Sequence, residues 1–461
     1  MNEVIRMTFE AFCKNPAACS VALIGFGRAN RAVLRWLFAR GGTATVYAET
    51  PPPDRASLEA LGIPLVVGPF PCVFPQNVLV RSPGVRPDIL PIARALSRGA
   101  LLVSETELFM ATAPCPLIGV TGSDGKTTTA NLTAALLRVA GHRVWLGGNN
   151  GTPLLTRVPE MTSSDMAVIE LSSFQLMTAR QTPDTAIVTN VTPNHLDWHT
   201  DMAEYTAAKC RIFSPETRLV LNGNDPVTRE IGRAREGNTV FFSPRDLQEN
   251  ALAYADKEDV VLREGGACRR FSCLSHFRLP GRHNLENLLA AVAASAPFID
   301  NKAPGLALLD FHGVPHRLQY VDTVRGVRYY NSSIDTSPSR TAAALSALGA
   351  HPLVILGGRG KGVPFSPLGA ALKAHAKAAY LYGEAAGEIA SALPKDFPRK
   401  IFSRFAEAFA AAAEDAGVGD TVLLSPACTA FGEFRDFEQR GEVFCRLVKE
   451  LGQGKETTCK N

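Results

Sequence analysis

The sequence has almost no excess of charge of either sign. Its 461 residues include 48 Lys and Arg against 44 Asp and Glu, which leaves a formal net charge of +4. Nucleic-acid-binding domains usually present a strongly basic surface, so this balance argues against nucleic acid as the main partner. A local basic cluster around an anionic ligand remains compatible with it.

Cysteine spacings typical of metal or redox sites are also missing. The ten cysteines are scattered, no Cys-x-x-Cys occurs, and no Cys/His ladder has zinc spacing. The longest weakly polar stretch, residues 288–299, is shorter than the ~20 residues of a membrane span. The N-terminal segment has charges inside its apolar part, unlike a secretory signal. We therefore expect reduced cysteines in a cytoplasmic protein without a membrane span.

The sequence does have enough apolar content and length for several cores. Hydrophobic residues make up 46% and charged residues 20%, as in ordinary globular proteins. At about 150 residues per domain, the length corresponds to three domains. Pro114 and Pro116 mark one linker, and a polar stretch at 301–305 marks a second boundary. We predict domains at 1–112, 113–303 and 304–461.

Each predicted domain alternates strands and helices, which indicates an α/β fold with mostly parallel, doubly wound sheets. The clearest predicted helices are 31–39, 131–140, 284–294 and 402–416. The predicted strands are 21–25, 44–47, 64–67, 78–81, 100–103, 117–120, 166–170, 186–189, 218–221, 327–330, 352–356, 378–382 and 421–424.

The first strand ends at Gly25 and Gly27, a pattern that suits a phosphate at a helix N-terminus. Asn30 stands where a third glycine would be expected, so a plain strand-to-helix turn fits equally well.

The sharpest motif is Gly119-Val-Thr-Gly-Ser-Asp-Gly-Lys-Thr-Thr-Thr129, which follows an apolar strand and precedes a helix. That context is typical of a phosphate-binding loop, in which backbone N–H groups surround anionic oxygens. Lys126 would add a cation for the phosphates, and Thr127 would place a hydroxyl where Mg²⁺ binds. Val120 occupies the first glycine position of the strict pattern, so the match is incomplete.

Two further strands end in polar side chains. Glu170 closes one strand and could bind Mg²⁺ beside the loop, although an isolated glutamate is more often an ion-pair partner. His195 and His199 follow another strand. On a helix they would share one face as a metal pair, but a single functional His195 is the preferred interpretation.

Lys209 lies in an otherwise apolar helical segment. Such a lysine usually extends its ammonium to solvent. The alternative is a neutral lysine that reacts with CO₂ and becomes a carbamate able to bind a metal. Together these motifs indicate ATP-dependent chemistry, and the residues alone leave a kinase, an ATPase and a ligase open.

The order of the motifs resembles the Mur ligase family. The matching segments are GVTGSDGKTTT, WLGGNNGTPLL, VIELSSFQL, TNVTPNHLDWH, LPGRHNLENLLAA, FHGVPHRLQ and LLSPACTAFGEFRDFEQRG. ELSSFQL, RSPGV and SPAC…FEQRG are the more discriminating segments, and they favour the members that add D-glutamate. The resemblance extends from about residue 24 to residue 444.

The resemblance implies three domains: a Rossmann-like domain for a UDP-linked substrate, a central P-loop ATPase domain, and a C-terminal Rossmann-like domain that closes on ATP and binds the amino acid. It also implies the reaction. ATP and Mg²⁺ would convert UDP-N-acetylmuramoyl-L-alanine to an acyl phosphate, which the amine of D-glutamate attacks. A cytoplasmic monomer without nucleic-acid or membrane partners is expected.

The resemblance also assigns individual roles. The metal residues would be Thr127, Glu170, His195 and a carbamylated Lys209, with Lys126 on the transferred phosphoryl group. The ATP residues would be Gly122, Ser123, Asp124, Gly125, Lys126, Thr127, Thr128, Asn284, Asn287 and Arg317. The UDP-linked substrate would contact Gly25, Phe26, Gly27, Arg28, Asn30, Ser82, Pro83, Gly84 and Asn149, and D-glutamate would contact Thr336, Lys361 and Ser425.

Some positions depart from the family pattern. Ser332 stands where the family has an aspartate. Asp335, three residues further on, is the nearest acid that could replace it, and we place no weight on it. Ala430 and Gly432 lack the usual hydroxyl and carboxylate. Two alternative functions follow: a related ligase with another substrate, such as a relative of folylpolyglutamate synthetase, and a nucleotide-binding paralogue without catalysis.

Overall fold

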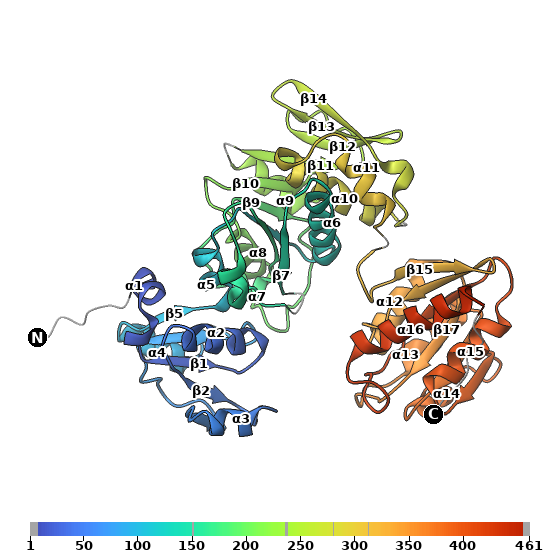
Figure 1. Ribbon diagram of the computed structural model, residues 1–461, viewed down its shortest axis with the longest axis horizontal. Coiled ribbons are helices and arrows are strands. Elements are labelled where there is room, and N and C mark those ends of the chain that lie inside the picture. The colour runs from blue at the N-terminus through green and yellow to red at the C-terminus, as the bar shows by residue number, and fades with distance from the viewer. Residues whose placement is uncertain (1–7, 150–151, 236–237, 280, 312, 455–461) are drawn as a thin grey trace, which may run out of the picture. The chain divides into compact units, whose positions relative to one another are not determined.

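The computed structural model describes residues 8–149, 152–235, 238–279, 281–311 and 313–454. Within these residues the strands form three sheets, of five, nine and six strands. Figure 1 shows the first sheet in blue, the second in green to yellow, and the third in orange to red. The sheets fall inside the three predicted domain ranges, while the boundary residues themselves stay predictions.

The first sheet has the strand order β3-β2-β1-β4-β5, and all its pairs are parallel. Its β1 is buried along its whole length, as expected of a central parallel strand. The strands are β1 (Val21–Ile24), β2 (Thr45–Ala48), β3 (Leu65–Val67), β4 (Val78–Arg81) and β5 (Leu101–Val103). The helices are α1 (Phe9–Lys14), α2 (Arg28–Phe38), α3 (Arg55–Ala60), α4 (Leu90–Ser97) and α5 (Glu105–Thr112), and a 3₁₀ turn spans η1 (Pro16–Ala18).

The second sheet has the order β14-β13-β12-β11-β10-β9-β6-β8-β7, with β6 between β8 and β9. The pairs from β7 to β12 are parallel, and β12, β13 and β14 form antiparallel hairpins. The strands are β6 (Leu117–Thr121), β7 (Val144–Gly148), β8 (Met166–Glu170), β9 (Thr185–Val188), β10 (Arg218–Asn222), β11 (Thr239–Ser243), β12 (Leu252–Asp256), β13 (Asp259–Glu264) and β14 (Ala267–Ser272). The helices are α6 (Lys126–Val139), α7 (Ser173–Leu176), α8 (Met202–Cys210), α9 (Pro226–Arg233), α10 (Arg282–Ser295) and α11 (Ala303–Leu309), with 3₁₀ turns η2 (Leu155–Glu160), η3 (Leu274–His276) and η4 (Ala296–Phe298).

The third sheet has the order β15-β16-β20-β17-β18-β19. Only the edge pair β15–β16 is antiparallel among the described strands of this sheet. The strands are β15 (Gln319–Val324), β16 (Val327–Asn331), β17 (Leu353–Gly357), β18 (Ala378–Tyr382), β19 (Arg399–Phe402) and β20 (Thr421–Leu424). The helices are α12 (Pro338–Leu348), α13 (Ser366–His375), α14 (Ala386–Ala392), α15 (Phe405–Asp415) and α16 (Phe437–Gly452).

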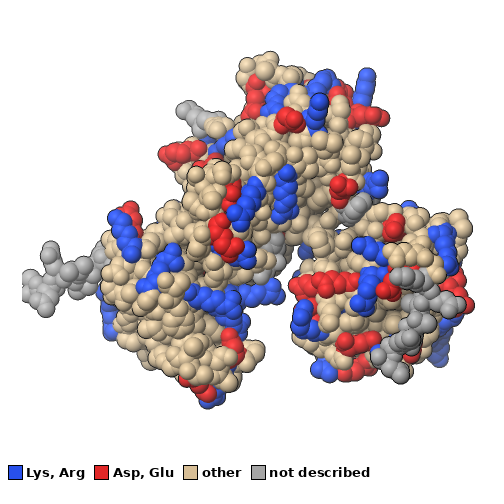
Figure 2. All heavy atoms as spheres, in the orientation of Figure 1, with Lys and Arg blue, Asp and Glu red and all other residues tan. Residues whose placement is uncertain are grey.

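The described residues form two compact units. The first contains those of Met1–Phe277 and Arg282–Asp310, and the second those of Arg278–Gly281 and Phe311–Asn461. The first two sheets share the first unit because one apolar cluster runs through both, from Phe12 to Leu252. On the face seen in Figure 2, acidic and basic side chains are interspersed over both units. Across the described residues, every helix is too short or too polar to cross a membrane.

The predicted helices differ from the structure mainly at their starts. The helix expected at 131–140 begins at Lys126, directly after the glycine-rich loop. The helix expected at 31–39 begins at Arg28, with Gly27 as its N-cap. In both cases the helix starts close to the end of the preceding strand, so its first N–H groups lie at the carboxyl edge of the sheet, where parallel α/β folds bind ligands.

Candidate active site

The loop between β6 and α6 turns at two glycines. Gly122 has φ 147° and Gly125, the N-cap of α6, has φ 81°, both unfavourable for other residues. A Cβ at Gly122 would collide with Thr189 Oγ1, and a Cβ at Gly125 would collide with Asn287 Oδ1. These positions therefore require glycine. The loop leads into the N-terminus of α6, and helix N-termini commonly bind anions.

The central residues of the loop are held by the segment that follows β9. The Ser123 N–H donates to the Asn190 carbonyl, and the Ser123 hydroxyl donates to the Thr192 carbonyl, both at 2.9 Å. The Asp124 N–H donates to Asn190 Oδ1 at 2.9 Å. The glycine-rich loop is thus held in place by contacts from a neighbouring strand end.

Lys126 and Thr128 lie in the first turn of α6. Lys126 Nζ donates to the carbonyls of Gly122 and Ser123, each at 2.9 Å. Phosphate oxygens are stronger acceptors than carbonyls, so this ammonium can exchange one set of partners for the other. Thr128 is half-buried in the same turn.

Glu170 joins two other predicted site residues. It ends β8 and is 2% exposed. Thr127 Oγ1 donates to its Oε2 at 2.7 Å, and Asn149 Nδ2 donates to its Oε1 at 2.8 Å. The Asn149 N–H also donates to the Glu170 carbonyl at 2.8 Å. Asn150 and Gly151, which follow in the predicted motif, lie outside the described residues.

Lys209 does not reach solvent, so the usual expectation for such a lysine is wrong. It is 2% exposed on α8, and its Nζ donates to the Gly122 carbonyl at 2.7 Å. The ammonium also lies 4.4 Å from the centre of the Tyr205 ring. Burial lowers the pKa of Lys209 to about 7, helped by the charge of Lys126 and opposed by that of Asp124. Part of the amine is therefore neutral near pH 7, as reaction with CO₂ requires.

The interpretation of His195 and His199 as a helical metal pair is wrong. Residues 191–200 form turns and bends rather than a helix, and His195 has φ 56°. His199 is 1% exposed, with Nε2 2.9 Å from Ser173 Oγ and Nδ1 3.1 Å from Glu204 Oε2. Both ring nitrogens are engaged, and burial lowers the pKa of His199. His199 is therefore a structural residue.

His195 is exposed and lies against the Phe174 ring, with ring centroids 4.9 Å apart. In the described part of the chain, no hydrogen bond joins it to Glu170 or Lys209. Nor do three His, Cys, Asp or Glu side chains of this part gather closely enough to hold a metal on their own. A metal at this loop would need additional oxygens from a substrate or from a modified lysine.

Asn284 and Asn287 share one face of α10, as predicted. Asn287 is 5% exposed and accepts a hydrogen bond from Thr129 Oγ1 at 3.2 Å. Its Nδ2 donates to Asn284 Oδ1 at 3.4 Å. The pair thus lies directly beside Gly125 of the phosphate loop.

The Gly25 turn meets a second loop, at Ser82. Gly25 has φ 74°, and a Cβ there would lie 2.9 Å from Ser82 Oγ. Asn30, predicted to contact the UDP-linked substrate, is fully buried beneath this turn. Its Nδ2 donates to the carbonyls of Gly25 at 2.7 Å and Val80 at 3.2 Å. Asn30 therefore stabilises the turn through these hydrogen bonds, which accounts for an asparagine in place of the third glycine of the motif at this position.

The remaining predicted residues of the first sheet lie around this turn. Phe26 is 9% exposed, and the Arg31 guanidinium lies 5.0 Å from the centre of its ring. Arg28 begins α2 and is exposed. The carbonyl of Gly84, which follows Pro83, accepts a hydrogen bond from Trp198 Nε1 at 3.1 Å. The loop after β4 thus contacts the segment that carries His195.

Arg81 is a buried residue that the sequence reading overlooked. It is 1% exposed and donates to the carbonyls of Pro83 at 2.9 Å, Val85 at 2.7 Å and Phe174 at 2.7 Å. Burial lowers its pKa to about 10, so it stays charged near neutral pH. It ties the Ser82 loop to Phe174 of α7. The sequence feature that could have indicated this role of Arg81 is a charged residue at the end of an apolar strand.

Arg86 makes a second connection across the same unit. Its guanidinium binds Glu204 at 2.9 Å and also hydrogen-bonds the Trp198 carbonyl. The hydrogen bond from Arg86 is the main reason that the pKa of Glu204 falls to about 2. Glu204 also holds His199, so this ion pair orders the turn that carries His195.

We expect Arg81→Met to lower the free energy of unfolding by about 3 kcal/mol, because three part-buried carbonyls lose the donor that the buried guanidinium supplies. Urea denaturation of the purified protein measures this change. Arg94→Met is the matched control, since Arg94 is exposed and donates to one exposed carbonyl, that of Cys72 at 3.2 Å. Equal stability of the two variants would contradict the role given to Arg81.

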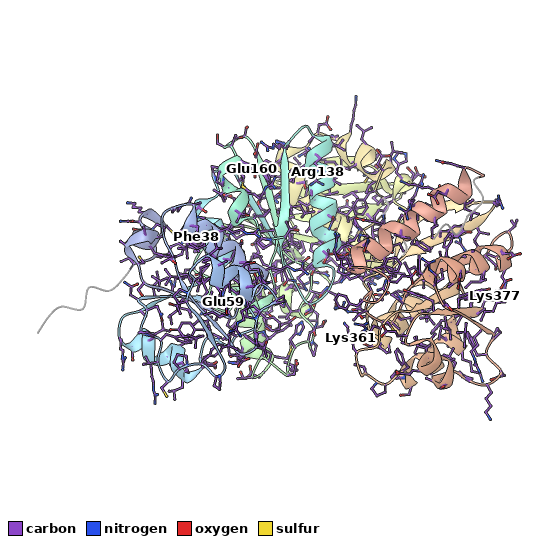
Figure 3. All side chains as sticks on the ribbon, turned by 60° about the horizontal axis from the view of Figure 1, so that its bottom comes forward. Phe38, Glu59, Arg138, Glu160, Lys361 and Lys377 are labelled. Carbon is purple, nitrogen blue, oxygen red and sulfur yellow. The ribbon has the colours of Figure 1, made fainter. Side chains whose placement is uncertain are left out.

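The second unit carries the other predicted residues. Lys361, labelled in Figure 3, follows β17 and donates from Nζ to Thr336 Oγ1 at 3.0 Å. Ser425 follows β20 and is fully buried. Arg317 is exposed in a turn closed by a hydrogen bond from its N–H to the Val314 carbonyl at 3.1 Å. The structure brings Lys361 and Thr336 together, whereas Ser425 lies beneath the surface.

The loop after Ser425 is fixed by a fully buried arginine, Arg440. Its guanidinium donates to the carbonyls of Ser333 at 3.0 Å, Cys428 at 3.1 Å and Thr429 at 3.2 Å. Gly432, further along the loop, has φ 106°, a conformation that disfavours the aspartate usual there. Glycine at position 432 thus suits the backbone conformation found there.

Two protein-family models match long stretches of the chain. The Mur ligase middle domain model matches residues 120–295, and the Mur ligase glutamate ligase domain model matches residues 316–428. A UDP-N-acetylmuramoylalanine–D-glutamate ligase from Symbiobacterium thermophilum is 40% identical over 447 residues, which cover 93% of this chain and 98% of that protein. The chain belongs to the Mur ligase family.

A second relative with the same name, from Ruminiclostridium cellulolyticum, is 35% identical over 466 residues and covers 96% of this chain and 99% of its own. Among solved structures, the UDP-N-acetylmuramate-alanine ligase of Thermotoga maritima aligns with a TM-score of 0.54 at 18% identity, over 94% of this chain and 99% of that one. This structural match supports the three-domain α/β architecture of a Mur ligase.

Proposed function

We propose that the chain is an ATP-dependent ligase that joins D-glutamate to UDP-N-acetylmuramoyl-L-alanine in the synthesis of peptidoglycan precursors. Relatives of that name align over nearly the whole chain. The observation that carries the proposal is the hydrogen-bonded cluster of Thr127, Glu170 and Asn149 beside the start of α6, with the buried amine of Lys209 bonded to the Gly122 carbonyl.

The reaction has two steps. An oxygen of the L-alanine carboxylate bonds to the γ-phosphorus of ATP, and ADP leaves. The D-glutamate nitrogen then bonds to the acyl carbon, phosphate leaves, and the nitrogen gives up a proton. Both steps bring anions together, so positioning and charge compensation dominate the catalysis.

The phosphate loop would bind ATP through the backbone from Gly122 to Thr128, and Lys126 would move from its carbonyls to the transferred phosphoryl group. Asn284 and Asn287 would contact the adenine, and Arg317 the phosphates. Asn149 and the loops at Gly25 and Ser82 would hold the UDP-linked substrate, with Arg28 near its phosphates. Thr336, Lys361 and Ser425 would bind D-glutamate.

The residues present fit Mg²⁺. Thr127 Oγ1 and Glu170 Oε2 lie 2.7 Å apart beside the phosphate loop, a hydroxyl and carboxylate pair suited to that ion. His195 and a carbamate on Lys209 would hold a second ion. Mg²⁺, when bound, would offset the negative charge of ATP and of the carboxylate. We also propose that the protein works as a monomer in the cytoplasm, where ATP and nucleotide-linked precursors occur.

Phosphate release tests the proposed function. We expect release from ATP and Mg²⁺ only when UDP-N-acetylmuramoyl-L-alanine and D-glutamate are both present, with L-glutamate much less effective. Release with another amino acid would move the function to a different specificity. ATP binding without release under any of these conditions would support a non-catalytic paralogue.

A further inference from the structure

Asp335 is a buried carboxylate in the second unit. It lies between β16 and α12 and is 7% exposed. Ser425 Oγ donates to its Oδ2 at 2.8 Å, and the Asp335 N–H donates to the Ser332 carbonyl at 3.0 Å. Burial raises the pKa of Asp335, and the hydroxyls of Ser332 and Ser425 together with the charges of Arg317 and Arg340 oppose that rise. The carboxylate is thus surrounded by groups that favour its charged form.

The sheet explains why Ser332 and Ser425 lie side by side near this carboxylate. β16 and β20 are parallel neighbours, with Asn331 paired to Leu424 at their carboxyl ends. Ser332 directly follows the last residue of β16, and Ser425 directly follows the last residue of β20. The Ser332 N–H donates to the Leu424 carbonyl at 2.7 Å. Both hydroxyls therefore leave the sheet side by side.

The network reaches three segments of the proposed site. The Leu318 N–H donates to Ser332 Oγ at 3.1 Å, which ties in the turn that carries Arg317. Thr336, the neighbour of Asp335, binds Lys361. Ser425 opens the loop after β20. The Asp335 carboxylate thus lies where these segments meet. One segment carries Arg317, which we place at the ATP phosphates, and the others carry residues that we place at the amino acid.

We propose that Asp335 is a positioning residue that orients Ser425 for the amino-acid substrate and, through Ser332, fixes the Arg317 turn. This inference rests on the proposed function. It gives a physical account of the departure at position 332. The Asp335 N–H donates to the Ser332 carbonyl at 3.0 Å, so the segment carries an acid three residues beyond position 332.

The test is steady-state kinetics of Asp335→Asn. Without its charge, residue 335 holds Ser425 more weakly, so we expect KM for D-glutamate to rise about tenfold or more. KM for UDP-N-acetylmuramoyl-L-alanine should stay within about twofold, because we place that substrate on the first unit. Asp396→Asn is the control, since Asp396 is exposed in the same unit. An unchanged KM for D-glutamate would overturn the proposal.

A double-mutant cycle separates positioning from general stability. If Asp335 acts through the Ser425 hydroxyl, Asp335→Asn should add little to the KM effect of Ser425→Ala. Fully additive effects on KM would show that Asp335 does not act through the Ser425 hydroxyl, and they would overturn the proposal.

If Asp335→Asn does not fold, Ser332→Ala tests the second connection. It keeps the carboxylate and removes the acceptor of the Leu318 N–H, so we expect KM for ATP to rise several-fold. An unchanged KM for ATP would refute the link to the Arg317 turn. Failure of the proposed function is distinct, because the unmodified protein would then give no product with D-glutamate. The same KM comparison would be made with the amino acid that it does use.

Discussion

Lys126→Ala is expected to lower kcat by about a hundred- to a thousandfold, the usual cost of removing a key electrostatic group from a reacting centre. The side chain lies over the carbonyls of Gly122 and Ser123, at the mouth of a loop whose shape is fixed by two obligatory glycines. The loop should therefore keep its shape in the variant and lose only the cation. Rapid-quench phosphate release measures the effect.

The comparison with Lys302→Ala makes this prediction specific. Lys302 is an exposed lysine of the same unit, far along the chain from the loop, and its loss should leave turnover unchanged. A melting temperature within a few degrees of the unmodified protein would exclude unfolding of Lys126→Ala as the cause. Turnover of Lys126→Ala at the normal rate would contradict the role that we give to the phosphate loop in the mechanism.

The sequence predicted those parts of the site that depend on local patterns. One short segment between a strand and a helix contains Gly122, Gly125, Lys126 and Thr127. The spacing of these residues in the sequence is therefore enough to predict their relative positions. Glu170 was predicted from its place at a strand end. Its contact with Thr127 follows from the parallel pairing of β6 and β8, which brings both strand ends to one edge.

The residues that the sequence did not predict depend on tertiary burial. Arg81 looks like an ordinary charged residue at the end of a strand, and only the packing of two sheets into one unit shows that its partner is the Phe174 carbonyl. Asn30 was predicted to contact the UDP-linked substrate and is fully buried, because a polar residue in the first turn of α2 can point toward β1 and β4. The prediction that His195 and His199 form a metal-binding pair assumed helical periodicity. The segment forms turns instead, so that periodicity does not apply.

Lys209→Met is expected to lower kcat by about a hundredfold, and the unmodified protein should lose activity when CO₂ is removed from the buffer. Lys209 is buried against the Gly122 carbonyl, and its pKa of about 7 leaves much of the amine neutral at physiological pH. A neutral amine nitrogen can bond to the carbon of CO₂ and release one proton, which converts the neutral amine into an anionic carbamate. A lysine that starts as a cation must first release another proton.

The sign of the pH dependence follows from that proton. Protonation blocks the reaction below the pKa, so at fixed dissolved CO₂ the carbamylated fraction, and with it the activity, should rise as pH increases through about 7. Bicarbonate added to a CO₂-depleted preparation should restore activity in the unmodified protein. Lys209→Met supplies the matched control, since its side chain has a similar length and cannot react with CO₂.

The alternative is that Lys209 acts as an unmodified amine, and the same measurements distinguish it. A lysine that works as a cation would give activity that falls as pH rises through about 7 and that ignores bicarbonate. A lysine that only supports the Gly122 carbonyl would tolerate Lys209→Met with modest loss, because the buried aliphatic chain is retained. Carbamylation alone combines three outcomes: loss on substitution, a rise with pH, and rescue by bicarbonate in the unmodified protein but not in the variant.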